Sequence, residues 1–264
     1  MANVRISKTT LKAVAILEKL NEFGEATNAA IATALEIPRA TSYRLLETLR
    51  VAGMVDKDPD SHTYRPAERV LALSSGFEQE NWISAAAKPH IDELGAQLLW
   101  PIAIATLAGT SMLLRETTDR DSPLVVRRYL RGRRVDIAST ATGRVYLAHC
   151  LPEQRGALLQ MLRRSDAPLQ PDRSDGKTLE QRLKAIRKAG FDTSKVHSSA
   201  VVWCAMAVPV FSSKQVIASL SVRYEERAVS KARLREEILP ALRRTAQRIT
   251  DSFHDQESAQ RPPG

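Results

Sequence analysis

The stretch IPRATSYRLLETLRVAGMVDKDPDSHTYRP, residues 37–66, decides the fold of the first third of this chain. Pro38 suits the first turn of a helix, where its missing N–H is not needed, and Gly53 suits a helix end. With 3.6 residues per turn, one side of the helix between them is formed by Ser42, Leu45, Leu46 and Leu49. The other side is polar, so we predict a helix buried on one side and open to solvent on the other.

Two shorter helices precede this segment and a small hairpin follows it. The second of these helices begins at Thr27-Asn28, which are good N-caps, and Pro59-Asp60-Ser61 supplies a turn between Val55 and Tyr64. The first helix ends at Gly24, and its apolar side is expected to be Leu11, Val14, Ala15, Leu17 and Leu20. Three helices and a hairpin in this order are the layout of a winged helix-turn-helix, which we place at residues 1–66.

In that fold the third helix enters a DNA major groove and the hairpin lies over the flanking backbone. Arginine can bridge guanine O6 and N7, threonine can contact a thymine methyl or a phosphate, and tyrosine commonly anchors a phosphate. The candidates are Arg39, Ala40, Thr41, Tyr43 and Arg44 in the helix and Lys57, His62 and Arg65 in the hairpin. The alternative is a plain helical subdomain whose exposed side happens to be polar.

The composition excludes several classes of protein. Of the 264 residues, 43% are hydrophobic and 26% are charged, which suits ordinary buried cores. No stretch approaches the roughly 18 apolar residues that span a membrane, and the N-terminus carries no apolar signal segment. Two cysteines, Cys150 and Cys204, make no disulfide framework. We therefore expect a cytoplasmic protein with no membrane contact.

The positive charge is not concentrated at the predicted DNA-binding end. Lys and Arg number 39 against 30 Asp and Glu, a net charge of +9 that favours anionic partners. Residues 1–66 hold nine basic and eight acidic side chains, whereas residues 111–164 hold eleven basic and five acidic ones. The DNA-binding prediction thus depends on residue pattern and not on net charge.

Motifs of enzymes and metal sites are not found in the sequence. There is no GxSxG elbow, GxxxxGK[ST] loop, GxGxxG fingerprint or HExxH helix. The spacing of His149, Cys150, His197 and Cys204 matches no zinc template. We predict that the protein is not an enzyme and uses no metal and no cofactor.

Residues 11–76 resemble the DNA-binding head of the IclR family of bacterial transcriptional regulators, and the stretch that carries the likeness is IPRATSYRLLETLRVAGMVDKDPDSHTYRPAERVLAL, residues 37–73. The likeness continues in RRVDIASTATGRVYLAH, residues 133–149, and VVWCAMAVPVFSSKQVIASLSVRY, residues 201–224. Within the family, residues 82–101 and 113–134 look closest to regulators of hydroxyphenylpropionate and related aromatic-acid catabolism. The resemblance implies an α+β protein: a winged helix-turn-helix, a linker helix and a C-terminal α/β effector-binding domain of GAF-like type.

The rest of the chain is predicted to form the linker and this second domain. The linker helix covers residues 67–80, with a bend at Ser74-Ser75-Gly76, and the effector-binding and oligomerisation domain covers 81–254. Pro89 is expected to kink or split a helix over 82–98. Further strands are expected at 102–109, 111–118, 122–130, 201–211 and 216–224, and further helices at 142–149, 152–162, 178–189 and after Ser230. Residues 255–264 are expected to be a disordered tail.

The family resemblance implies an effector pocket on one face of the sheet, beside the ASTATGR turn. Strand alternation puts Ser219, Ser221 and Arg223 on one face, where Arg223 is suited to hold a carboxylate. The full set of candidates is Leu113, Ala141, Thr142, Trp203, Ala205, Met206, Ser221 and Arg223. The alternatives are a solvent-facing Arg223, ordinary core positions for Trp203 and Met206, and a simple helix start at Thr142.

Together these features predict a ligand-responsive regulator of a catabolic operon. Its partners are expected to be double-stranded DNA with a near-palindromic operator, a small effector of the aromatic carboxylate class, and further copies of the chain in a homodimer or homotetramer. Two other functions stay open: a constitutive DNA-binding protein without an effector, and an enzyme that uses the C-terminal pocket.

Overall fold

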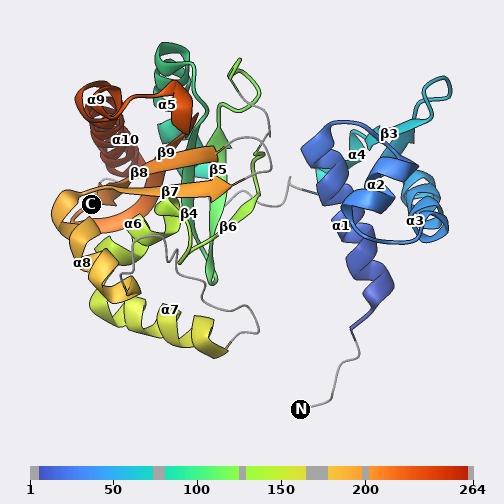
Figure 1. Cartoon of the computed structure of the whole chain (residues 1–264), viewed down its shortest axis with the longest axis horizontal. Coiled ribbons are helices and arrows are strands. Elements are labelled where there is room, and N and C mark those ends of the chain that lie inside the picture. The colour runs from blue at the N-terminus through green and yellow to red at the C-terminus, as the bar shows by residue number, and fades with distance from the viewer. Residues whose placement is uncertain (1–5, 74–80, 125–128, 165–177, 198–201, 261–264) are drawn as a thin grey trace. The chain divides into compact units, whose positions relative to one another are not determined.

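The computed structural model describes residues 6–73, 81–124, 129–164, 178–197 and 202–260. The chain divides into two compact units, Met1–Gln79 and Glu80–Gly264, and each is a structure of its own with its own core. Figure 1 shows the two units and labels most of their helices and strands.

The N-terminal unit has the three helices and the hairpin that the sequence predicts. Its elements are α1 (Lys8–Phe23), β1 (Ala26–Thr27), α2 (Asn28–Ala34), α3 (Arg39–Val51), β2 (Val55–Lys57), β3 (Thr63–Pro66) and α4 (Arg69–Ala72). The short strands form an antiparallel sheet in the order β1-β3-β2. Ser7 and Thr27 cap α1 and α2 by accepting hydrogen bonds from Thr10 N and Ala30 N.

The core of this unit confirms the predicted buried side of α3 and corrects that of α1. Ser42, Leu45, Leu46 and Leu49 are all buried. In α1, however, Leu11 and Val14 are exposed, and Ile16 and Leu20 are the buried residues. Ala13 and Leu17 pack against the same core, so the side of α1 that faces the core is rotated relative to the predicted one. Of the predicted linker helix the structure describes α4, and the predicted bend at Ser74–Gly76 lies outside the described residues.

The C-terminal unit is a six-stranded antiparallel sheet with helices on both faces. The sheet order is β6-β5-β4-β9-β8-β7. Its strands are β4 (Ile102–Ala108), β5 (Ser111–Thr117), β6 (Arg134–Asp136), β7 (Asp192–His197), β8 (Val202–Ser212) and β9 (Gln215–Glu225). Its principal helices are α5 (Asn81–Leu98), α6 (Ala141–His149), α7 (Pro152–Arg164), α8 (Leu179–Ala189) and α10 (Leu239–Gln260).

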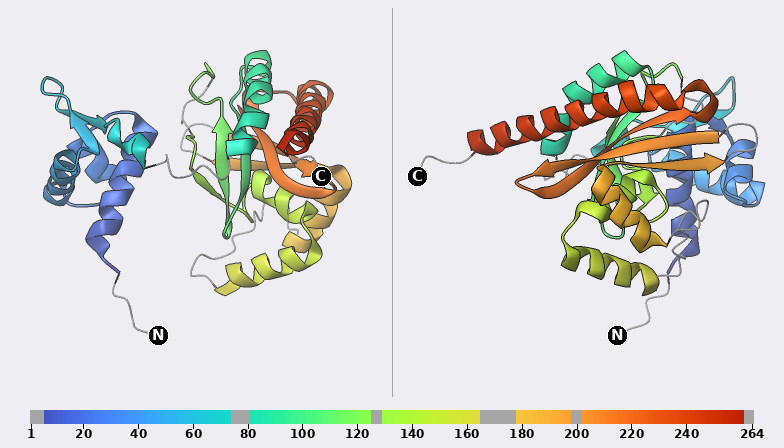
Figure 2. Two further views of the ribbon diagram at one scale, coloured as in Figure 1. Left: turned by 180° about the vertical axis from the view of Figure 1, so that it is seen from behind. Right: turned by 60° about the vertical axis from the view of Figure 1, so that its left-hand side comes forward.

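Two hydrophobic cores flank this sheet. Alternate residues of β8, such as Met206 and Val208, pack under α5 and α10. The residues between them face α6, α7 and α8, where Ala207 contacts a cluster that includes Val145 and Leu147. Figure 2 shows α10 lying across one face of the sheet with α6, α7 and α8 on the other. The α+β fold class predicted from the sequence is thus confirmed.

Four features of this unit differ from the prediction. The described parts of 122–130 contain no strand, with residues 125–128 outside the described ranges, and the partner of β5 is instead β6. The edge strand β7 was not predicted. Pro89 lies within the single helix α5, which it does not split. Residues 255–260 are helical, because α10 continues to Gln260, although the sequence indicates a disordered tail from 255.

The start of the last helical region follows the prediction. Ser230 accepts a hydrogen bond from Arg233 N and caps α9 (Lys231–Arg233). A π-helical turn, Leu234–Ile238, then leads into α10. Among the described residues, no helix has the length and apolar character needed to cross a membrane.

Candidate functional site

Helix α3 exposes its polar side to solvent because its apolar side packs in the core of the N-terminal unit. Asn28 Nδ2, at the start of α2, donates to Arg39 O at 3.2 Å and joins the beginnings of the two helices. Pro38 occupies the N-cap position, where it makes no side-chain hydrogen bond. The first turn of α3 is therefore fixed by its neighbour and remains accessible.

The residues predicted to read DNA lie on this open side. Arg39, Ala40 and Arg44 are exposed, and Tyr43 is 47% exposed. Thr41 is half-buried. Since Arg39, Tyr43 and Arg44 belong to the first two turns of α3, they project from one end of the helix. This is the end that a recognition helix places against base edges.

The hairpin residues have more varied surroundings than the sequence implies. His62 is exposed at the tip, with a φ of 54°. Arg65 is exposed and lies 4.0 Å from Asp56 Oδ2. Lys57 is half-buried, and its Nζ lies 6.0 Å from the ring centroid of Tyr43 and 5.5 Å from that of Tyr64. Lys57, the last residue of β2, thus lies close to Tyr43 of α3 and contributes positive charge where the hairpin meets that helix.

A hydrogen-bonded group that sequence reasoning missed fixes the hairpin against α3. Glu47 accepts hydrogen bonds from Arg50 Nε and from Tyr64 Oη, each at 2.9 Å. The bonds from Arg50 and Tyr64 lower the pKa of the Glu47 carboxyl, while burial raises the pKa of Tyr64 to about 12. The spacing of Glu47 and Arg50 at i and i+3 was visible in the sequence, whereas the contact with Tyr64 depends on the tertiary fold.

In the C-terminal unit, the ASTATGR turn forms a tightly bonded start to α6. Asp136 Oδ1 accepts from Ala138 N and Ser139 N at 2.9 and 2.6 Å, and Thr140 Oγ1 accepts from Gly143 N at 3.1 Å. Gly143 is required here, because a Cβ at this position would lie 2.3 Å from Ile137 Cα. The helix start is therefore rigid.

A buried ion pair holds this turn against β7. Arg144 is 0% exposed, and its Nε donates to Asp192 Oδ2 at 2.6 Å. Its other nitrogens donate to Ser139 O at 2.6 Å and Thr193 O at 3.1 Å. Burial raises the pKa of Asp192, and the Arg144 guanidinium acts in the opposite direction. Arg144 thus connects the turn, the helix and the edge strand.

Five of the eight predicted effector residues gather on the face of the sheet that α6 covers. Ala205 is paired with Arg223 and with Ser194 across the strands, and Ser221 is paired with Ala207. Ser194 Oγ accepts from Ala141 N at 3.0 Å, which brings the start of α6 onto the same surface. Thr142 follows Ala141 and is buried.

The three other predicted residues, all apolar, do not line that surface. Met206 belongs to the core under α5 and α10, because it alternates with Ala205 along β8. Leu113 is paired with Thr106 and so lies on the opposite face from its neighbour Met112, which faces α6. Trp203 packs against the α5 and α10 core and makes an edge contact with Trp100, with ring centroids 6.4 Å apart. The predicted apolar wall is therefore wrong for these residues.

Arg223 is held by an acid and an aromatic ring. Its Nη2 donates to Asp119, which is fully buried and also accepts from Tyr129 N at 2.6 Å. The Arg223 guanidinium lies 3.9 Å from the Tyr129 ring centroid, and that of Arg133 lies 4.1 Å from the same centroid. Arg223 is therefore oriented by the protein and is not the solvent-facing arginine of the alternative.

Two independent sequence matches cover both units. Residues 9–59 match the family described as IclR helix-turn-helix domain, and residues 79–251 match the family described as bacterial transcriptional regulator IclR C-terminal. The chain belongs to the IclR family of bacterial transcriptional regulators. This confirms the family identified from the sequence, and the matched families and relatives are regulators and not enzymes.

Two bacterial regulators resemble this chain over most of its length. The Pca regulon regulatory protein of Pseudomonas putida is 27% identical, covering 82% of this chain and 73% of that protein. The HTH-type transcriptional regulator KdgR of Escherichia coli K12 is 28% identical, covering 97% and 99%.

Solved IclR structures share the fold. The IclR of Thermotoga maritima aligns with a TM-score of 0.65 at 19% identity, over 93% of this chain and 98% of that one. An IclR homolog from Microbacterium hydrocarbonoxydans, complexed with 4-hydroxybenzoate, aligns with a TM-score of 0.62 at 22% identity, over 94% and 100%.

Cys150 and Cys204 are free and buried, and burial raises the pKa of both thiols. His149 Nδ1 lies 2.9 Å from Val145 O within its own helix. No three His, Cys, Asp or Glu side chains of the described residues gather in a way that suits a metal ion.

Proposed function

We propose that this IclR-type regulator controls a catabolic operon and responds to an aromatic carboxylate. The proposal includes binding to a near-palindromic operator by a homodimer or homotetramer in the cytoplasm. The observation that carries it is the open side of α3, where Arg39, Tyr43 and Arg44 are exposed while Ser42 and the three leucines opposite are buried. An exposed basic and hydroxyl-bearing helix in a winged helix-turn-helix is suited to reading base edges.

The effector part of the proposal rests on the surface between α6 and the sheet. A guanidinium oriented by Asp119 and stacked near Tyr129 suits a ligand that is both anionic and aromatic. On the same face, Ser219 is fully buried, and its Oγ has no hydrogen-bond partner among the described residues. A buried unpaired hydroxyl is rare in proteins, and a bound polar ligand would satisfy it.

Relatives support the same chemical class. The Microbacterium homolog is complexed with 4-hydroxybenzoate, and the Pseudomonas relative is named for the pca regulon. A ligand acts on DNA binding only if it prefers one of two states of the regulator. We therefore expect the acid to change operator affinity.

One experiment on the full-length protein tests both parts. Binding sites are selected from a random duplex pool, and affinity is then measured for a selected site and a scrambled one, with and without 4-hydroxybenzoate. Arg44→Ala is expected to reduce the preference for the selected site by about tenfold, since a bidentate arginine–guanine contact discriminates by about 1–3 kcal/mol. Arg244→Ala, an exposed arginine of α10, is the matched control.

The effector readout uses Arg223→Ala and Thr142→Val. Both are expected to weaken the response to the acid while the preference for the selected site stays that of the wild type. Arg223→Ala removes the ion-pair partner of the buried Asp119, which can itself disturb the fold. Thr142→Val tests the site with that ion pair left intact. Equal preference ratios in wild type and Arg44→Ala would refute the recognition-helix assignment. An operator affinity that no aromatic acid changes would favour the constitutive alternative.

A further inference from the structure

Two strands in the middle of the large sheet separate part-way along their length. β4 and β9 are paired from Ile102 opposite Val222 to Ala105 opposite Ser219. Beyond this point β4 continues to Ala108 and β9 extends back to Gln215, each still paired with its outer neighbour. The sheet is therefore open between Thr106–Ala108 of β4 and Gln215–Ala218 of β9.

Two β-bulges flank this opening. In the β4–β5 pair the register shifts between Ile104 and Ala105, so that Arg115 is the extra residue. In the β8–β9 pair the register shifts between Val210 and Phe211, so that Ile217 is the extra residue. A bulge bends its strand and increases the local twist, and bulges are common beside binding sites. The two hairpins thus bend at the position where they stop pairing with each other.

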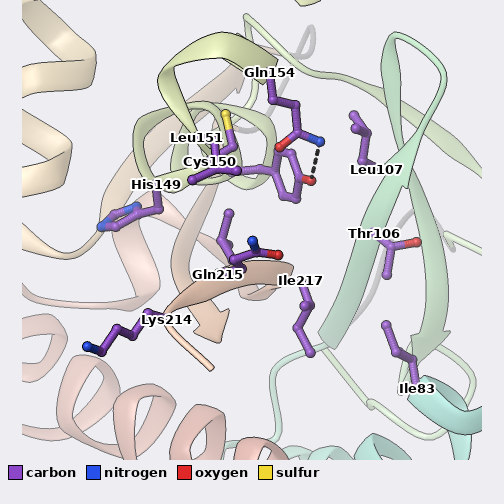
Figure 3. Close-up of a pocket in the computed structure, with 12 residues that line it drawn as sticks. Ile83, Thr106, Leu107, His149, Cys150, Leu151, Gln154, Lys214, Gln215 and Ile217 are labelled. Carbon is purple, nitrogen blue, oxygen red and sulfur yellow. Dashed lines mark hydrogen bonds between the residues drawn. The ribbon is translucent and has the colours of Figure 1, made fainter. Parts of the chain in front are cut away.

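A hollow of about 400 Å³ occupies the opening. This volume lies within the range of about 300–1,000 Å³ that small-molecule sites have. Its lining comes from both layers of the domain: Ile83 from α5, and Tyr146, Cys150 and Gln154 from the α6–α7 side. Val216 adds an apolar wall from β9. Leu107 and Ile217, labelled in Figure 3, add further apolar walls from the separated strands.

Neutral polar groups converge on this hollow. Gln154 Nε2 donates to Tyr146 Oη at 3.2 Å, as the dashed line in Figure 3 marks. The same tyrosine is 5% exposed, and its hydroxyl is the acceptor of this bond, so its own proton is not used in it. The amide of Gln215 points toward the middle, whereas the ammonium of Lys214 points away from it (Figure 3). Burial raises the pKa of Tyr146, which keeps the hydroxyl protonated as a donor.

We propose that this hollow, named here the β4–β9 pocket, is a second ligand site that takes a small, uncharged aromatic compound with a carbonyl head. The carbonyl oxygen accepts from the Tyr146 hydroxyl, the amides of Gln154 and Gln215 complete the polar end, and the ring packs on Leu107 and Ile217. No charged side chain of the lining is directed at the centre, so a carboxylate would lose its hydration without gaining a counter-ion. The site is thus opposite in charge preference to the proposed effector site at Arg223.

Calorimetry on the full-length protein with benzamide as the probe tests the proposal, with benzoate as its charged counterpart. Benzamide is expected to bind saturably, and Tyr146→Phe is expected to weaken it by about fivefold or more, the effect of one lost neutral hydrogen bond. Leu107→Trp, which fills the hollow, is expected to abolish binding. The matched controls are Tyr224→Phe, which removes a buried tyrosine hydroxyl from the core under α5 and α10, and Met161→Trp on the exposed side of α7.

The outcomes separate this site from the proposed effector site. Arg223→Ala is expected to leave benzamide affinity unchanged, whatever it does to 4-hydroxybenzoate. Thermal unfolding of each variant shows that it is folded, and Tyr146→Phe keeps the test valid if Leu107→Trp does not fold. No benzamide binding to the wild type, or binding that Tyr146→Phe and Leu107→Trp leave intact, would overturn the β4–β9 pocket. Benzoate that binds there as tightly as benzamide would overturn its charge preference.

Discussion

Helices α3 and α6 share residue types in their first two turns and differ in the exposure of their arginines. Both are short, both contain a threonine and an arginine in their first two turns, and each supplies its domain with buried residues. Arg44 of α3 is exposed, whereas Arg144 of α6 is 0% exposed and bonded to Asp192. Helical periodicity finds the apolar side of a helix, but what covers the polar side depends on elements far away in the sequence.

Among the substitutions considered for α3 and α6, we expect the largest loss of stability from replacing the buried Arg144. Arg144→Met removes the hydrogen-bonded partner of Asp192 and leaves a buried carboxylate whose nearest cation is Arg182, with Nε 3.9 Å from Asp192 Oδ1. We expect the C-terminal unit to lose about 3–5 kcal/mol of unfolding free energy, the usual result of breaking a buried pair from one side. Segment-resolved hydrogen exchange in α6 and β7 of the full-length protein measures it.

The control variant is Arg244→Met on the exposed side of α10, with an expected change within about 0.5 kcal/mol. The double variant Arg144→Met with Asp192→Leu is expected to recover much of the loss, since neither charge of the Arg144–Asp192 pair remains buried. A single variant as stable as its control would show that α6 does not depend on the ion pair.

A second, smaller effect is expected at the first turn of α6. Gly143→Ala places a methyl group 2.3 Å from Ile137 Cα and carbonyl oxygen, so the turn or the helix must shift. Overpacking of this kind costs about 1–3 kcal/mol. Thermal unfolding measures the loss, and Gly156→Ala in α7, with no atom within 4 Å of the added carbon, is the matched control. The control is expected to be neutral or slightly stabilising. Equal effects would contradict the close approach.

The smallest effect is expected in α3 and has the opposite sign. Ser42 is 0% exposed, and its Oγ has no hydrogen-bond partner among the described residues. Ser42→Ala removes a buried unsatisfied hydroxyl, so we expect the amides of α3 to be more protected by about 1 kcal/mol. Thr48→Ala, which removes an exposed hydroxyl from the same helix, is the control. Weaker protection in Ser42→Ala than in the control would place an unseen partner at this hydroxyl.

The sequence predicts those elements that local signals define, and it misses those that depend on distant parts of the chain. The elements of the N-terminal unit and the buried side of α3 are predictable because periodicity, caps and turn residues are local signals. The strand β7 escapes prediction because DTSKVH has no apolar alternation, and its place at the sheet edge comes from pairing with β8. The helical residues 255–260 include one apolar residue, Ala259, so no apolar periodicity predicts that the helix continues through them.

Some residues of the candidate sites were likewise predictable from the sequence, and others were not. The exposed face of α3 follows from spacing alone, and the grouping of Ala205, Ser221 and Arg223 follows from strand alternation combined with family resemblance. Met206 and Leu113 are placed wrongly because the resemblance gives positions along a strand but not its facing, which pairing and bulges decide. The β4–β9 pocket is invisible in the sequence, because it arises where two hairpins bend apart.

The burial of both cysteines has a practical consequence. Thiolates react with maleimides, and neither Cys150 nor Cys204 offers an accessible thiolate, because each is buried with a raised pKa. A single cysteine added at an exposed site would therefore accept a fluorophore without prior removal of native residues. Met161→Cys on α7 and Val51→Cys at the end of α3 would give a donor and an acceptor, one in each unit, for following the distance between the two units in solution.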